Sequence, residues 1–204
     1  MDNIEQGSDE WFAQRLGKVT ASRIADLLAK TKSGWGASRT NYEAQIIAER
    51  LTGQREETVK SAAMERGNEV EAEAREAYEF FNNVTVVETS FVDHPIVEMS
   101  GASPDGFVGG EGLVEIKCPN TATHLSTLLG GSIKGVYLKQ MQWQMACTGR
   151  KWCDFVSYDP RMPEHLQMHV QRIERDDDLI KEIEEQVVIF LEGVTDKIKK
   201  LEQA

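Results

Sequence analysis

Apolar residues recur at helical spacing through the first part of the chain, where they predict four helices. The segment 8–15 opens with a serine, whose side chain can cap a helix, followed by two acidic residues. The segment 20–30 follows a threonine cap and places its apolar side chains on one face. A glycine-rich stretch, 32–40, predicts a loop, and 40–53 then predicts a helix that ends at a glycine. The longest of these helices is expected over 61–82.

Beyond residue 82 the period shortens. In 84–119, short β-branched runs alternate with turn residues and predict a meander of three or four strands. The segment 136–149 returns to the helical period and also ends at a glycine. Two more strands are expected over 151–160 and 164–176, followed by a C-terminal helix over 177–203 with a continuous apolar stripe.

The order of these elements defines the expected fold class. Helices, a mixed sheet, a helix, two strands and a final helix indicate an α/β (α+β) sandwich. A chain of 204 residues suits a single domain, 1–204. Within it we expect a helical N-terminal elaboration over 1–60, a core over 61–175 and a C-terminal helix over 176–204.

Composition places the chain among ordinary globular proteins, with 40% hydrophobic and 28% charged residues. No apolar run is long enough to span a membrane, and the acidic, polar start does not resemble an export signal. Three cysteines are few and odd in number, which indicates reduced thiols instead of a disulfide framework. We therefore expect a cytoplasmic protein.

A net charge of −11 argues against a general nucleic-acid binder, whose surface normally carries a basic patch. Much of the acidic excess, however, lies in two helical blocks, 69–79 and 173–186. The region 15–60 is close to charge balance. A basic groove on an acidic body is therefore compatible with the composition.

The stretch GASPDGFVGGEGLVEIKCP, 101–119, combines turn residues with four charged residues, among them Asp105, Glu115 and Lys117. Side chains alternate along a strand, so Glu115 and Lys117 should share one face. Asp105 is expected to end the preceding strand, and a glycine-rich hairpin can bring it beside Glu115. Two adjacent carboxylates repel each other, and a divalent cation relieves the repulsion. Oxygen ligands favour Mg²⁺ or Mn²⁺, and Lys117 could then orient or deprotonate an attacking water.

An exposed hairpin with an ordinary surface salt bridge is the alternative interpretation. The apolar neighbours Leu113, Val114 and Ile116, together with the upstream Ser-Pro-Asp-Gly, favour the metal site.

Five ordered blocks extend this motif: QRLGKVTAS, RGNEVEAEAR, SPDG…LVEIKCP, YLKQMQWQM and YDPRM. In order and spacing, from about Trp11 to about Met162, they resemble the phage lambda exonuclease family (YqaJ-type viral recombinases). That family belongs to the PD-(D/E)xK nucleases, and the resemblance implies a restriction-endonuclease-like core with a mixed central sheet flanked by helices.

The resemblance also implies an activity. Members digest one strand of linear double-stranded DNA in the 5′→3′ direction to 5′-mononucleotides, and they use two Mg²⁺ ions. The 3′ single-stranded overhang left behind serves recombination by strand annealing. The expected partners are DNA ends, a single-strand annealing protein and two further copies in a ring-shaped homotrimer. A phage or prophage protein in a bacterial host cell is implied.

Matching motifs carry the family's catalytic residues onto this chain. Asp105, Glu115, the Ile116 carbonyl and Glu71 would hold the metals. Lys117 would activate the attacking water. The helix glutamine that contacts the site corresponds to Gln140. From the residues alone, Glu71 could equally lie on an ordinary acidic helix face, and Gln140 could be amphipathic filler.

The family's DNA-end residues can be carried over in the same way. Arg15 would grip the terminal 5′-phosphate, assisted by Ser22 and Ser103, and Trp11 would flank the DNA end. A family lysine near position 62 has no direct counterpart, and Lys60 is its candidate substitute. A family basic residue near position 123 is also missing from this chain. Without the motif match, Arg15 could be a surface arginine on a short helix.

Two rival functions remain open at this level. A structure-specific PD-(D/E)xK endonuclease would use the same core on another substrate. A catalytically weak DNA-end-binding protein would keep the fold with a residual site, although the intact Asp105, Glu115 and Lys117 argue against it.

Overall fold

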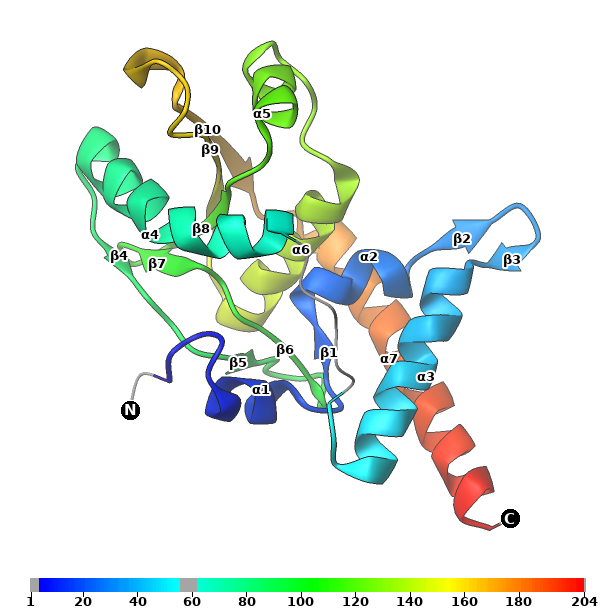
Figure 1. The fold of residues 1–204 in the computed structure, drawn as a ribbon. Coiled ribbons are helices and arrows are strands. Elements are labelled where there is room, and N and C mark those ends of the chain that lie inside the picture. Colours follow the sequence, from blue (N-terminus) through cyan, green and yellow to red (C-terminus); the bar gives the residue numbers. More distant parts are fainter. Residues whose placement is uncertain (1–3, 56–61, 204) are drawn as a thin grey trace.

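The computed structural model describes residues 4–55 and 62–203, and its main feature is a mixed five-stranded sheet (Figure 1). The strand order is β10-β9-β8-β7-β4, and only β8 and β9 run parallel to each other. The bounds of these strands, in sheet order, are Met168–Glu174, Trp152–Tyr158, Gly112–Lys117, Gly106–Val108 and Val86–Val87. The α/β class with a mixed central sheet is thus confirmed.

A second, three-stranded sheet has the order β1-β6-β5. β1 (Val19–Thr20) runs parallel to β6 (Ser100–Ala102), and β6 pairs antiparallel with β5 (Val92–Asp93). The expected single meander over 84–119 is therefore wrong: the segment holds five strands divided between two sheets. Because β6 pairs with β1, some eighty residues earlier in the chain, a local pattern could not reveal this partner.

Two helices cover the faces of the central sheet. α4 (Ala62–Asn82) packs Ala74 and Tyr78 against the apolar side chains Val114 and Ile116 of β8. Figure 1 shows α4 lying across this sheet. α6 (Gly135–Thr148) packs on the other face, where Leu113 joins the methionines of α6. Because side chains alternate along β8, Val114 and Ile116 face α4, whereas Leu113 faces α6.

At the N-terminus, α1 (Asp9–Arg15) confirms the expected short helix, and the Ser8 hydroxyl accepts from the Trp11 N–H at 3.2 Å. The helix expected over 20–30 is only partly confirmed, because the segment does not form one continuous helix. A 3₁₀ turn (Ala21–Arg23) leads into α2 (Ile24–Leu27), because Arg23 has non-helical backbone angles between them. The apolar spacing still places its side chains in the core.

The loop expected over 32–40 is also partly wrong: β3 (Gly34–Trp35) pairs with β2 (Lys30–Thr31) in a small hairpin, and the next helix already begins at Ala37. α3 (Ala37–Thr52) then ends at Gly53, whose φ of 66° is left-handed, as the glycine predicted. α7 (Asp177–Glu202) lies alongside α3 (Figure 1), and the Tyr42 and Phe190 rings stack at 5.6 Å.

One helix was not foreseen. α5 (Thr121–Leu128) follows β8 directly and begins at Asn120, whose side chain accepts from the Thr123 N–H at 2.9 Å. The helix is rich in Thr, Ser and His, which are weak helix formers. Polar anchors hold it instead: Thr121 donates to Asp159 Oδ2 at 2.7 Å, and buried His124 lies 2.8 Å from the Ser157 hydroxyl.

Among the residues that the structure describes, no helix is both long and apolar enough to cross a membrane.

Candidate active site

The hairpin β7–β8 brings the expected acidic pair together. Gly106 faces Val114 in its register, which sets Asp105 opposite Glu115. The Ile116 N–H donates to Asp105 Oδ2 at 2.7 Å and fixes the carboxylate. The expectation that Asp105 ends the preceding strand is wrong. The preceding strand, β6, ends at Ala102, Pro104 cannot donate a backbone hydrogen bond, and Asp105 directly precedes β7. The pairing of the two carboxylates survives this correction.

Glu115 is fully buried on the face of β8 that meets α6. Its Oε1 accepts from Gln140 Nε2 at 2.6 Å and also contacts the Lys117 ammonium. Its Oε2 accepts from Gln144 Nε2 at 2.7 Å. Glu115 and Lys117 therefore share a face, as strand alternation predicts, and Gln140 touches the site from α6.

The charges at this site perturb one another. Burial, followed by the charge of Glu115, raises the pKa of Asp105 well above its usual range. Burial also raises the pKa of Glu71, on α4, and Glu115 adds to the rise. Burial alone would lower the pKa of Lys117, but the Glu115 and Asp105 carboxylates outweigh it and raise the pKa. Lys117 is therefore held as an ammonium, and the acidic groups favour a neighbouring positive charge.

The donor set suits a hard cation, although it is not gathered into a closed cage. Within the described ranges, no group of three His, Cys, Asp or Glu side chains is close enough to hold a metal ion. Mg²⁺ keeps several waters and commonly takes only one or two carboxylates from the protein. Asp105 and Glu115 can supply these, and their mutual repulsion is the kind that a divalent cation relieves. The residues present therefore fit Mg²⁺ or Mn²⁺.

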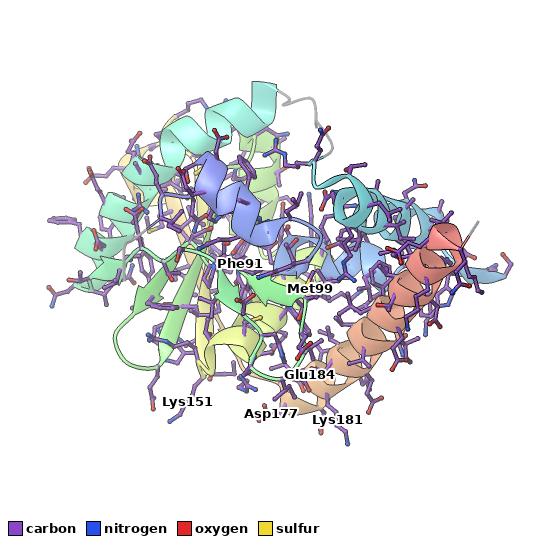
Figure 2. All side chains as sticks on the ribbon, turned by 90° about the horizontal axis from the view of Figure 1, so that it is seen from below. Phe91, Met99, Lys151, Asp177, Lys181 and Glu184 are labelled. Carbon is purple, nitrogen blue, oxygen red and sulfur yellow. The ribbon has the colours of Figure 1, made fainter. Side chains whose placement is uncertain are left out.

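A second group of expected residues gathers at α1. The Ser103 hydroxyl accepts from both Trp11 Nε1 and Arg15 Nη1, each at 3.0 Å. The Arg15 guanidinium stacks 4.0 Å from the centre of the Trp11 ring, and Phe91 lies close to α1 (Figure 2). Burial lowers the pKa of Arg15 to about 10, which leaves it cationic at neutral pH.

A cavity of about 660 Å³ connects the two groups. Its lining includes Asp105, Glu71, Arg15, Trp11 and Ser22. Glu115 and Gln140 are not part of that lining. Lys60 lies outside the described residues. The cavity thus joins two carboxylates to the arginine that the resemblance assigns to the DNA end.

Two residues of this region were missed from the sequence. Gln144 lies one helical turn after Gln140, and that spacing was the available signal. Arg55 also lines the cavity, with its guanidinium 3.7 Å from the centre of the Phe12 ring. It follows α3 in an irregular segment, so no periodic pattern marks it.

Comparisons with known proteins find similarity to a viral recombinase family and to exonucleases of known structure. A family model described as a YqaJ-like viral recombinase domain matches residues 10–151. Among solved structures, an alkaline exonuclease (LHK-Exo) from Laribacter hongkongensis is 53% identical, with a TM-score of 0.90, over 96% of this chain and 97% of that chain. The structure of LHK-Exo in complex with dAMP matches over the same shares at 53% identity, with a TM-score of 0.91.

A more distant solved structure shares the fold. It is a phage-related exonuclease from Haemophilus somnus 129PT, 16% identical, with a TM-score of 0.70 over 90% of this chain and 96% of that chain. No curated protein matches this sequence.

Proposed function

Because this chain belongs to the YqaJ-like viral recombinase family, we propose that it is a Mg²⁺-dependent exonuclease acting on linear double-stranded DNA. The family and the 53% identical alkaline exonuclease support a DNA exonuclease. Beyond that, we propose 5′→3′ digestion of one strand to 5′-mononucleotides, which leaves a 3′ overhang for strand annealing. The complex of LHK-Exo with dAMP is in keeping with a mononucleotide product.

One observation carries this proposal: a single cavity is lined by the carboxylates Asp105 and Glu71 and by the guanidinium of Arg15. The carboxylates would hold the cations that act on the scissile phosphate. A planar, permanently charged guanidinium suits a terminal phosphate. A nuclease that cuts only within a strand would not need the second group.

Each residue then has a part in hydrolysis. Asp105, Glu115, Glu71 and the Ile116 carbonyl would hold two Mg²⁺ ions or, as a substitute, Mn²⁺. When bound, these ions would supply Lewis-acid stabilisation and favour ionisation of the attacking water.

The remaining side chains position the substrate. As an ammonium, Lys117 would orient the water and offset charge on the phosphoryl group. Gln140 would keep the Glu115 carboxylate in place. Arg15, with Ser22 and Ser103, would bind the terminal 5′-phosphate, and Trp11 would flank the end.

We also propose a ring-shaped homotrimer, a single-strand annealing protein as partner and an origin in a phage or prophage acting in the bacterial cytoplasm. The family likeness supports each of these. The acidic excess lies partly on α7, where Asp177 is exposed at the rim of the molecule (Figure 2).

The decisive experiment incubates linear duplex, labelled on each strand in turn, with Mg²⁺ and then with EDTA. Progressive loss of the strand with the 5′-phosphorylated end supports the proposal. Cuts within closed circles would instead indicate an endonuclease, and binding without hydrolysis would indicate an end-binding protein. Asp105→Ala should abolish turnover, whereas Lys197→Gln, which removes an exposed ion pair on α7, should leave it intact.

A further inference from the structure

Two arginines that line the cavity near α1 each stack on an aromatic ring. The Arg15 guanidinium stacks on the Trp11 ring at 4.0 Å, and the Arg55 guanidinium stacks on the Phe12 ring at 3.7 Å. The two rings touch edge to face, with centroids 4.8 Å apart. Neighbouring residues of one short helix therefore hold two cations beside each other.

Neither cation forms an ion pair with a carboxylate in the described part of the chain. Other arginines of the cavity do: Arg23 pairs with Asp26 at 2.7 Å, and Arg75 pairs with Glu88 at 3.0 Å. Burial is the main cause of the lowered pKa of Arg15, and the charge of Arg55 adds to it, whereas Tyr42 and the Glu49 carboxylate oppose it; the two guanidinium groups therefore repel each other. Like charges kept together without an ion-pair partner favour an anion between them.

We propose that Arg15 and Arg55 form a two-arginine clamp for the terminal 5′-phosphate monoester. This assignment rests on the proposed exonuclease function. A phosphate monoester carries a charge of about −1.5 to −2 near neutral pH, whereas an internal phosphodiester of the strand carries a single charge. Arg55 therefore gives the site its preference for a phosphorylated end over an internal phosphate or a 5′-hydroxyl.

The test compares kcat/KM on two duplexes that differ only in a 5′-phosphate or a 5′-hydroxyl. Arg55→Gln should lower the phosphate-to-hydroxyl ratio about tenfold, as expected for loss of one charge-assisted hydrogen bond. Arg55→Lys keeps the charge without the planar fork and should lie between. Lys197→Gln, which removes a cation that is not part of the cavity lining, should keep the wild-type ratio.

Failure of the clamp and failure of the exonuclease are distinguishable. If wild-type protein prefers the phosphorylated end and Arg55→Gln keeps that preference, the clamp is wrong. If wild-type protein does not digest linear duplex, the exonuclease proposal fails. Fluorescence anisotropy then measures binding of both duplexes to the Asp105→Ala protein, which tests the clamp without turnover. Adding Arg55→Gln to this protein should reduce the ratio of its affinities for the 5′-phosphate and 5′-hydroxyl duplexes, and an unchanged ratio overturns the clamp.

A second inference comes from the hydrogen bonds of Glu115. Its Oε1 meets two donors, Lys117 and Gln140, whereas its Oε2 meets only Gln144 among the described residues. Each carboxylate oxygen has about two lone-pair positions. Oε1 therefore accepts from two donors, whereas Oε2 has one lone-pair position left.

We infer that Gln144 is a positioning residue that fixes the orientation of the Glu115 carboxylate, which would be a ligand of the metal. Gln144 is fully buried, and its own Oε1 has no hydrogen-bond partner among the described residues. A buried unpaired acceptor destabilises a fold, so stability alone does not account for a glutamine here. This inference rests on the proposed Mg²⁺ dependence.

The test measures Mn²⁺ binding by titration calorimetry, without DNA. Gln144→Met keeps the size but removes the donor, and the Kd for Mn²⁺ should rise about tenfold or more, as for other residues that orient metal ligands. Gln142→Met is the matched control, because buried Gln142 bonds the Glu174 carbonyl and not Glu115. An unchanged Kd in Gln144→Met refutes the inference, whereas absent binding in wild type refutes the metal site itself.

Discussion

Gly106 follows Asp105 at the start of β7, and its lack of a side chain sets how closely β4 packs there. A Cβ built on Gly106 would lie 2.1 Å from Cγ1 of Val86. Carbon atoms in contact need about 3.5 Å, so one strand would have to move by roughly 1.4 Å. Val86 is stiff about its Cα–Cβ bond and buried, and it has little room to turn away. Gly106→Ala should therefore displace the strand that follows Asp105 and with it the carboxylate.

Both stability and activity should report this displacement. Overpacking of a core commonly costs about 1–3 kcal/mol, which corresponds to a fall in Tm of ~2–12 °C for a chain of this length. A shift of about 1 Å in a reacting group can reduce activity about 100-fold. Denaturant unfolding and kcat/KM on linear duplex measure the two effects separately.

Val86→Ala provides the internal check, because it deletes the methyl group that the new methyl group at position 106 would strike. Alone, it should destabilise by about 2 kcal/mol through lost burial. In the double variant the clash is gone, so the two losses should be less than additive by at least ~0.5 kcal/mol, and activity should partly return. Additive losses with no recovery of activity would show that the reasoning about this packing is wrong.

Three further outcomes are expected. Asp105→Asn should abolish hydrolysis yet stabilise the fold in EDTA. Because the folded-state pKa of Asp105 is raised, the wild type loses stability as the pH rises from the ordinary Asp pKa to that raised value. The stability difference between Asp105→Asn and wild type should therefore widen with pH. A difference in denaturation midpoint that does not change with pH would contradict this. Asp159→Asn should destabilise the fold at neutral pH, because hydrogen bonds from Arg161 lower the pKa of Asp159. Measured by urea titration, this loss of stability should shrink in strong acid, below the ordinary Asp pKa. Ser103→Ala removes the acceptor of Arg15 and should reduce the preference for 5′-phosphorylated ends about tenfold, whereas an equal slowing of both end types would refute that role.

Local signals in the sequence determined much of this structure. The Ser8 cap and the glycines at 53 and 149 predicted helix ends, since a hydroxyl acceptor and a left-handed glycine act within one turn. Alternation in β8 predicted that Glu115 and Lys117 share a face. These features depend on residues that are close in the chain.

The failures have a different physical origin. The pairing of β1 with β6 and the anchoring of α5 by Asp159 depend on contacts between distant segments. Arg55 was missed for the same reason, because only folding brings it to the Phe12 ring. Gln144 was within reach of a pattern, but nothing in its spacing shows which side chain of α6 meets Oε2 of Glu115.

The two ends of the cavity differ in how they are built. The bond from Ile116 to Asp105 joins residues 11 positions apart, within one hairpin, whereas the bond from Arg15 to Ser103 spans 88 positions. Contacts between near neighbours close a short loop, whereas distant contacts carry a larger loop-closure cost. Mild heat or denaturant should therefore release α1 before the hairpin opens. Under such conditions the proposed exonuclease would still cut phosphodiester bonds but would no longer distinguish a strand end from its middle, so that fidelity for ends would be lost before catalysis.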